Sequence, residues 1–208
     1  DGHIADTLIV AARTETGITL FLVPGEAATR TRLTMVDSRN AALIRLDNVA
    51  VGPDSVLGHA GLLDTVLDRA RAGLAAEMLG SANEAFDRTV QYLKDRKQFG
   101  VAIGSFQALK HRAAHMFCEV EITRSAVLAA VSALDQNGND AAALVSLAKA
   151  KSNETLYLCG NEGVQMHGGI GMTDEHEIGF FMKRARVAQA SFGDTSFCRD
   201  RYAQLMGY

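Results

Sequence analysis

The hydrophobic and polar positions follow one period before about residue 60 and another period after it. Residues 7–12 and 18–23 are short β-prone runs, and residues 43–51 alternate between apolar and polar in places. Turn residues, mostly glycine and proline, separate these runs. The pattern therefore predicts three or four strands of a partial antiparallel β-domain over residues 1–58, too few to be stable alone.

After residue 60 the apolar residues recur every three or four positions, as on one face of an α-helix. The first helical pattern begins near Gly61 and can continue to Arg96, with Ala and Gly in its middle that allow another helix to approach closely. The second pattern is the most regular, with apolar positions at Phe106, Leu109, Ala113, Met116, Val120, Val127, Ala130 and Leu134. It is expected to end at residues 136–139, with Gly138 as the left-handed residue that follows the helix.

A third helix is expected to begin after Asn139 or Asp140, either of which can cap it, and to end at the glycines of residues 168–171. Shorter helical patterns follow at about residues 177–190 and after Asp194. Long amphipathic helices joined by short turns are typical of an antiparallel four-helix bundle. The expected fold is therefore mainly α: a four-helix bundle with additional short C-terminal helices over residues 59–208, preceded by the partial β-domain.

The composition is that of a globular protein: 208 residues, 48% of them hydrophobic and 22% charged. A net charge of −3 does not indicate a nucleic acid or another polyanion as partner. The apolar runs are too short and too interrupted to predict a membrane span. The three cysteines, Cys118, Cys159 and Cys198, lie far apart, which is typical of reduced thiols in a cytoplasmic protein.

The first residues, Asp-Gly-His, carry no initiator methionine, basic start or apolar signal segment. The chain opens as if inside a fold, so we expect a fragment or a processed piece of a longer protein.

The stretch from Arg96 to Gln107 interrupts both long helical patterns and combines groups suited to a large, flat, phosphorylated ligand. Arg96 carries a fixed charge with a planar fork of donors, Gln98 and Gln107 add amides, and Phe99 and Phe106 add aromatic surface. Alternatively, the stretch is a plain helix hairpin in which Arg96 caps a helix and the Phe rings join the core. These residues by themselves favour the hairpin.

A second glycine-rich stretch, residues 165–171, follows the third helical pattern. Glycines at Gly168 and Gly169 allow a ligand to approach the backbone closely, beside Gln165. The stretch is neither a Walker loop nor a dinucleotide fingerprint, because no Gly-Lys-Ser/Thr follows it and no strand precedes it. It can equally be a glycine-rich helix terminator.

Other polar clusters have plainer interpretations. His111, His115 and Glu119 have a spacing that can bind a metal, but they lie beside an ordinary bundle core, so we expect no metal site. The acidic residues 174–177 are expected at a solvated helix start. The basic residues 183–186 are expected either to pair with those acids or to contact a polyanion. No Ser/His/Asp or Cys/His set can be assembled.

Taken together, these stretches resemble the acyl-CoA dehydrogenase family of flavoenzymes. Arg96-Lys-Gln-Phe-Gly with Phe106-Gln107 is similar to the family's Arg-x-x-Phe-Gly…Gln turn, and Gln165-Met-His-Gly-Gly-Ile-Gly is similar to its Gln-x-x-Gly-Gly-x-Gly segment. Residues 183–186 and 192–195 fall where the family has an Arg-Asp-Ala-like run followed by Glu-Gly-Thr. Segments within residues 6–51 resemble the second half of its middle β-domain.

The resemblance implies that roughly the first half of a full member is absent here, since members have an N-terminal helical domain, a β-domain and a C-terminal bundle. It also implies FAD as the cofactor. Arg96, Gln98 and Phe99 would bind its pyrophosphate and adenosine side from the neighbouring subunit of a dimer. The same cofactor would contact Gln107, Gln165, Gly168 and Gly169.

The family reaction removes an α-proton from an acyl-CoA, for which it needs a carboxylate base, and passes a β-hydride to FAD. At the family's usual Glu position this chain has Phe192, and at the alternative position on the first long helix it has Ala70, before Arg71. Asp194, two residues beyond the usual position, is the remaining candidate for the base.

The resemblance therefore implies an FAD-dependent acyl-CoA dehydrogenase of fatty acid or lipid catabolism, of which this chain is the C-terminal part. Alternatives are a base-lacking partner subunit of a hetero-oligomeric dehydrogenase and a non-catalytic helical scaffold. The expected partners are an acyl-CoA substrate, a second copy in a homodimer or homotetramer or else a base-supplying paralogue, and an electron-transfer flavoprotein as acceptor.

Overall fold

The computed structural model describes all residues from 1 to 208. Their contacts divide the chain into two compact units, Asp1–Leu67 and Asp68–Tyr208. The division falls inside the first long helix, so the first two turns of that helix group with the sheets.

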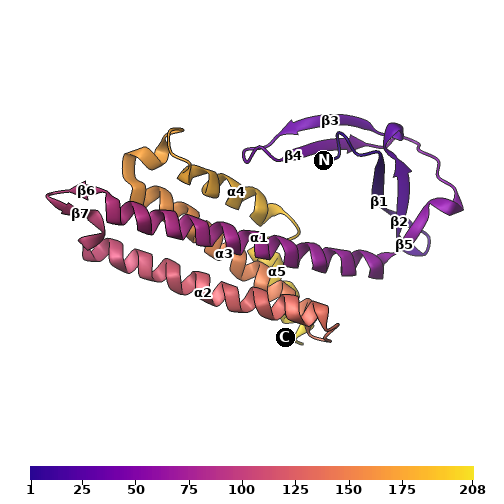
Figure 1. Cartoon of the computed structure of the whole chain (residues 1–208). Coiled ribbons are helices and arrows are strands. Elements are labelled where there is room, and N and C mark those ends of the chain that lie inside the picture. Colours follow the sequence, from indigo (N-terminus) through magenta and orange to yellow (C-terminus); the bar gives the residue numbers. More distant parts are fainter. The chain divides into compact units, whose positions relative to one another are not determined.

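The first unit contains two small antiparallel sheets (Figure 1). The first sheet has the order β1-β2-β5, from strands β1 (Thr7–Thr14), β2 (Gly17–Pro24) and β5 (Val56–His59). β1 and β2 form a hairpin that closes at Thr14 and Gly17, and Gly17 has a φ of +115°, which a side chain would oppose. The second sheet pairs β3 (Thr29–Thr34) with β4 (Asn40–Arg45).

The strands expected at 7–12 and 18–23 are confirmed and are slightly longer than expected. The third expected strand, 43–51, was wrong in its placement: β4 ends at Arg45, and the chain turns at Asn48, which has a φ of +53°. β3 was not predicted, because its sequence Thr-Arg-Thr-Arg-Leu-Thr has one large apolar residue and is mostly exposed. A strand that buries little leaves almost no hydrophobic pattern.

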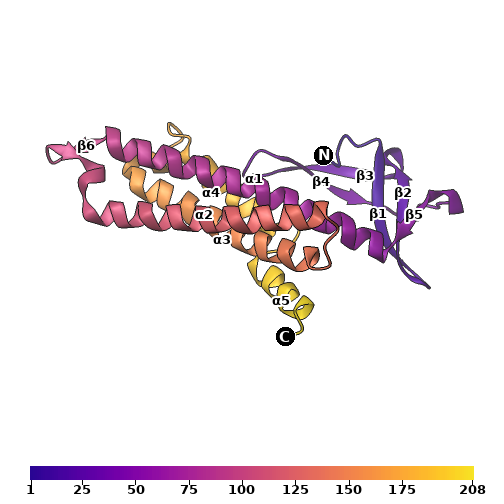
Figure 2. The same cartoon turned by 60° about the horizontal axis from the view of Figure 1, so that its bottom comes forward.

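The second unit is a helical bundle (Figures 1 and 2). Its helices are α1 (Ala60–Asp95, beginning in the first unit), α2 (Gln107–Asp135), α3 (Ala141–His167), α4 (Ile178–Ala190) and α5 (Thr195–Leu205). Both views show α1, α2 and α3 running alongside one another, and α3 is the helix that contacts α2, α4 and α5. The mainly α architecture with short C-terminal helices is confirmed.

The bundle core is packed closely because small side chains face it. Ala75, Ala82 and Ala85 of α1 are fully buried in one cluster with residues of α2 and α3 such as Met116 and Leu156. Small residues let helix axes approach, and the larger side chains of the neighbouring helices fill the space between them. This core fixes the ends of α1, α2 and α3 relative to one another, and the ends carry the candidate site.

The ends of the long helices differ from expectation in detail. The residue after α2 in the left-handed region is Asn137, with a φ of +52°, and not Gly138. The N–H of Gly138 donates to Ala133 O at 2.8 Å and that of Asn137 to Leu134 O at 3.2 Å, which is the Schellman arrangement with Asn as its left-handed residue. Asp140 precedes α3, but its side chain makes no capping hydrogen bond.

No helix is both long enough and apolar enough to cross a bilayer.

Candidate functional site

A short hairpin joins α1 to α2 and projects from one end of the bundle (Figure 1). It consists of β6 (Lys97–Gln98) and β7 (Val101–Ala102), with Phe99 and Gly100 at its tip. Phe99 has a φ of +53° and Gly100 one of +80°, so two successive left-handed residues turn the chain. The turn leaves the Phe99 ring 88% exposed, with the Phe106 ring edge-on to it at 6.0 Å between centroids.

The hairpin and the end of α3 together line a cavity of about 290 Å³. Five of the residues singled out from the sequence line it: Gln98, Phe99, Phe106, Gln165 and Gly168. The two glycine-containing stretches, nearly seventy residues apart in the chain, therefore form one site. This convergence is the main contribution of the fold to the candidate site.

Arg96, Gln107 and Gly169 do not line the cavity, although each is close in sequence to a residue that does. Arg96 is exposed, and its side chain makes no hydrogen bond or ion pair within the chain. Its backbone is fixed, because its N–H donates to Tyr92 O at 2.9 Å and its carbonyl accepts from Ile103 N at 2.8 Å. The guanidinium of Arg96 is therefore available to a group outside this chain.

Among the polar and aromatic residues of the cavity, three were not assigned from the sequence: Tyr92, Arg112 and His167. Tyr92 and Arg112 carry no local signal, since each is one polar residue on a helix that the bundle pattern already explains. His167 lies within the glycine-rich stretch that was singled out, so its position gave the only hint. The Arg112 Nε lies 3.4 Å from Glu162 Oε2, and this pair places both charges beside the cavity.

His167 is buried and stacked. Its ring centroid lies 4.2 Å from that of Tyr92 and 4.5 Å from that of His176. The Nδ1 atom is 2.7 Å from Gly163 O. Since a carbonyl only accepts, Nδ1 carries the proton and Nε2 is an acceptor. Burial lowers the pKa of His167, with the Gly163 bond opposing the shift and His176 adding to it, so the ring is neutral at pH 7.

The Nε2 atom of His167 is buried without a hydrogen-bond partner. Such an atom indicates a site that a water or a bound group completes. Close by, Gly168 has a φ of +67°, and a Cβ added at Gly168 or at Gly169 would meet open space. The backbone there is therefore open to a ligand.

These features fit one end of FAD. The aromatic rings suit an adenine face, the two glutamine amides suit its polar edge, and the glycines leave the backbone accessible to a pyrophosphate. Arg96 and Arg112 supply positive charge for phosphates. The cavity is too small for the whole dinucleotide, so the remainder would contact other surfaces.

The expected base positions lie elsewhere in the bundle, at the α4–α5 connection and on α1 (Figure 1). Phe192 has a φ of +59° and is 47% exposed, whereas Ala70 is partly buried. The Asp194 carboxylate accepts a hydrogen bond from Phe197 N, which makes Asp194 the N-cap of α5. The structure therefore gives the one acidic candidate a capping role.

The histidine spacing on α2 does not form a ligand cluster, since no group of three or more potential ligands is close enough to hold a metal ion. Glu119 is instead paired with Lys151, and His115 Nε2 lies 3.9 Å from Glu119 Oε1.

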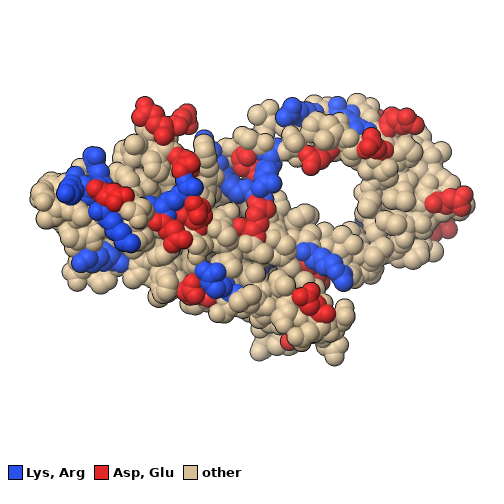
Figure 3. Space-filling view, in the orientation of Figure 1, with Lys and Arg blue, Asp and Glu red and all other residues tan.

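Acidic and basic groups are interleaved over the bundle face seen in Figure 3. Lys183 lies 3.8 Å from Asp174, Glu177 pairs with Arg88, and Arg184 is 2.7 Å from Glu77. The expected pairing of the 183–186 run with residues 174–177 is confirmed for Lys183. Two of the three basic residues of the run, Lys183 and Arg184, therefore each lie beside an acidic partner.

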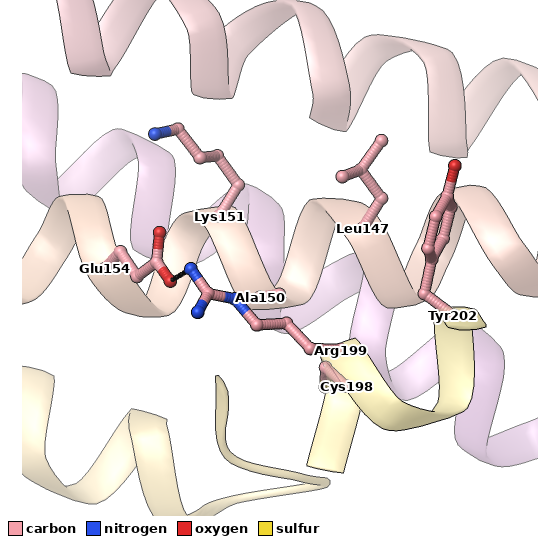
Figure 4. Close-up of a pocket in the computed structure, with 7 residues that line it drawn as sticks. All are labelled: Leu147, Ala150, Lys151, Glu154, Cys198, Arg199 and Tyr202. Atoms are coloured by element: carbon pink, nitrogen blue, oxygen red, sulfur yellow. Dashed lines mark hydrogen bonds and ion pairs between the residues drawn. The ribbon is translucent and has the colours of Figure 1, made fainter. Parts of the chain in front are cut away.

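A second cavity, of about 350 Å³, lies between α3 and α5 (Figure 4). Arg199 of α5 extends over Ala150 to pair with Glu154, while the Lys151 side chain points away from α5. The charged groups at this cavity already have partners, and no residue of the two glycine-containing stretches lines it. The cavity beside the hairpin is therefore the better candidate site.

Comparisons with known proteins agree with this geometry. Residues 60–206 match the model of the acyl-CoA dehydrogenase C-terminal domain. The acyl-CoA dehydrogenase IpdE2 of Mycolicibacterium smegmatis is 41% identical over 150 residues, which are 72% of this chain and 45% of that protein. The mitochondrial short/branched chain specific acyl-CoA dehydrogenase of Bos taurus is 30% identical over 180 residues, 82% of this chain and 41% of that protein.

Solved structures give the same picture. A glutaryl-coenzyme A dehydrogenase in complex with glutaryl-CoA superposes with a TM-score of 0.91 at 26% identity, covering 100% of this chain and 56% of that one. The structure described as the Tcur3481-Tcur3483 steroid ACAD G363A variant gives a TM-score of 0.86 at 29% identity, covering 97% and 55%. The match spans less than half the length of IpdE2 and of the Bos taurus dehydrogenase, and a little more than half of the two solved chains.

Proposed function

Because the chain belongs to the acyl-CoA dehydrogenase family, we propose that it is the C-terminal part of an FAD-dependent acyl-CoA dehydrogenase. Such an enzyme is an oxidoreductase that forms the α,β double bond of an acyl-CoA thioester. The observation that carries the proposal is the single cavity lined by Gln98, Phe99, Gln165 and Gly168.

In this proposal the bundle end holds the adenosine and pyrophosphate part of the cofactor. Gln98 and Gln165 hydrogen-bond to the polar edge of the adenine, and Phe99 packs on the adenine ring. The backbone at Gly168 approaches the phosphates. Arg96 pairs with the pyrophosphate, which agrees with its lack of a partner in the chain. FAD, when bound, supplies the hydride acceptor.

The exposed hairpin supports a cofactor that is shared between subunits. A ring that is 88% exposed at a hairpin tip, as Phe99 is, gains little from its own chain. Phe117, Ile122 and Leu128 on α2 are also more than half exposed. We propose a homodimer or homotetramer in which each hairpin reaches the FAD of its neighbour.

The proposal does not assign the carboxylate base to a residue of this chain. Phe192 at the usual base position favours a second candidate function. Neither Phe192 nor Ala70 can take a proton, and the Asp194 carboxylate is occupied as a helix cap. In this second version the chain belongs to a base-lacking subunit, and a paralogue supplies the carboxylate within a hetero-oligomer. The Tcur3481-Tcur3483 steroid ACAD, the 29%-identical neighbour named for two proteins, supports such an arrangement.

An acyl-CoA is the proposed substrate, and an electron-transfer flavoprotein is the proposed acceptor. A related structure at 25% identity, with a TM-score of 0.92, is described as an electron transferring flavoprotein of Acidaminococcus fermentans. The three cysteines are unpaired, which supports a cytoplasmic location.

The flavin content of the intact protein tests the proposal. We expect a purified protein with a flavin absorption spectrum, and a lower FAD affinity in the Gln98→Ala/Gln165→Ala double variant. Gln136→Ala, at the opposite end of α2, is the matched control and should bind FAD normally. A folded protein that takes up no FAD would leave the helical scaffold as its function.

A further inference from the structure

Lys149, in the first half of α3, is the largest of the fully buried side chains. An ammonium group in a protein interior must use its donors, or its burial becomes prohibitively unfavourable. Its Nζ donates to Asn153 Oδ1 at 2.6 Å, to Ala188 O at 3.1 Å and to Gly193 O at 3.0 Å. These three acceptors use all three N–H groups.

A second buried cation binds the neighbouring carbonyl. The Nε of Arg71 donates to Phe192 O at 2.8 Å, and its Nη1 donates to Asp68 Oδ1 at 2.9 Å. Asp68 in turn accepts from Arg201 Nη2 at 2.9 Å, so Arg71 is oriented by a network that reaches α5. Two consecutive carbonyls, those of Phe192 and Gly193, are therefore each held by a buried cation.

The segment that these cations hold has an unfavourable backbone. Phe192 and Gly193 have φ values of +59° and +116°, and left-handed backbone is rare for a residue such as Phe. A Cβ at Gly193 would lie 2.5 Å from a ring carbon of Phe197, so the position also requires glycine for space. Such a conformation persists only where its surroundings enforce it.

We propose that Lys149 and Arg71 are positioning residues that hold the Phe192–Gly193 turn in its left-handed conformation and so set the direction of the side chain at 192. That this side chain faces an acyl-CoA rests on the proposed function. The stabilisation of the turn by Lys149 and Arg71 does not rest on the proposed function, because it follows from contacts within this chain.

The charge of Lys149 is essential to this arrangement. A neutral amine keeps two N–H groups and presents a lone pair, so one of the three acceptors loses its donor. Desolvation lowers the pKa of Lys149 to about 8. Cys198 of α5 and Asp194 of the turn oppose this shift, and Arg71 of α1 adds to it.

Asp68, which pairs with Arg71, also forms an ion pair with Arg201, with 2.9 Å between Oδ2 and Nη2. No other charged group contacts the Lys149 ammonium through α4, which contributes only the Ala188 carbonyl. We therefore expect the turn to loosen as the pH rises from 7 through 9.

The absence of tryptophan from the chain allows a specific reporter. Phe192→Trp places one fluorophore on the turn at a half-exposed position, and Phe117→Trp, 51% exposed on α2, is the control position. The measurement is fluorescence anisotropy from pH 6.5 to 9.5 on the intact protein, with the signal of the same protein without the introduced Trp subtracted. The reporter at 192 should lose anisotropy with a midpoint near pH 8, and the reporter at 117 should not change.

Lys149→Met, combined with Phe192→Trp, removes the charge at similar length. The reporter should then be as mobile at pH 7 as it is at pH 9 in the presence of Lys149. Lys151→Met is the matched control, because Lys151 lies on the same helix, pairs with Glu119 and points away from α5 (Figure 4). It should leave the titration unchanged.

A flat anisotropy at 192 across this pH range, or an anisotropy at pH 7 that falls as much in Lys151→Met as in Lys149→Met, overturns the proposal. If Lys149→Met does not fold, the titration of Phe192→Trp with Lys149 in place still decides the question. None of these measurements needs flavin or acyl-CoA. A negative result in these measurements would therefore not contradict the proposed function. Likewise, a protein that binds no flavin would not contradict the role of Lys149 and Arg71 at the turn.

Discussion

The carboxylate of Asp194 accepts a hydrogen bond from the backbone N–H of Phe197, with 2.8 Å between Oδ1 and N. This contact satisfies one of the free N–H groups at the start of α5 and places negative charge at the positive end of the helix. The acidic residue nearest the family's base position therefore has a structural role that does not require substrate.

Replacement of Asp194 separates capping from catalysis. Asp194→Ala should lower the free energy of unfolding by about 1 kcal/mol, because the cap is lost. Asp194→Asn keeps a side-chain acceptor and should retain nearly full stability. Urea denaturation measures both variants. We expect flavin reduction by acyl-CoA to be unchanged in Asp194→Asn; a drop on the order of a hundredfold or more would identify Asp194 as the base.

Phe192→Glu should introduce the missing base. A positioned carboxylate contributes about 10²–10⁴-fold to removal of a weakly acidic α-proton. Anaerobic stopped-flow bleaching of the flavin by a panel of acyl-CoAs should be slow in the native homo-oligomer and at least about 10²-fold faster in this variant. Phe192→Gln, which has a similar shape but takes no proton, is the control. Rapid bleaching by the native homo-oligomer would show that another residue acts as the base.

Arg96→Ala should weaken FAD binding by about 2–3 kcal/mol, the scale of a hydrogen bond to a charged group, and leave helix content unchanged. Flavin titration measures the affinity and circular dichroism the helix content. Lys94→Ala removes a nearby exposed charge from α1 and should have little effect. Loss of helix content with normal affinity in the folded fraction would instead make Arg96 a structural cap.

The burial of Lys149 predicts a stability that rises in alkaline solution. Its pKa is about 8 in the folded chain against 10.5 for a free side chain. Between these values the unfolded chain binds a proton that the folded chain does not, so the free energy of unfolding increases with pH in this window. The full gain is roughly 3 kcal/mol at 1.36 kcal/mol per pKa unit. Below pH 8 both states are protonated and this dependence vanishes.

Urea denaturation at pH 7, 9 and 10 checks the sign. The difference in the free energy of unfolding between the native chain and Lys149→Met should grow in favour of the native chain above pH 8. Lys151→Met should show no such trend, because Lys151 is partly exposed. A difference that is constant with pH would mean that Lys149 keeps its ordinary pKa in the folded chain.

The sequence by itself determined the helices and part of the candidate site. The bounds of α1, α2 and α3 follow from burial of one helix face, which imposes a visible 3.6-residue period, and from glycines that end the pattern, as at Gly168. Gln98, Phe99 and Gln165 stood out because each lies in a turn or helix end where the pattern breaks. β3 was missed for the converse reason, since an exposed strand has no such pattern.

Only the tertiary structure decided which polar groups meet. Lys149 binds carbonyls 39 and 44 residues away, and Arg71 binds one 121 residues away. Within its own helix, Lys149 is one lysine in an Ala-Lys-Ala-Lys run, and nothing local distinguishes the buried residue from the partly exposed Lys151. The physical reason is that a side chain's periodicity reports whether it faces the core, whereas its hydrogen-bond partners depend on how α3, α4 and α5 pack.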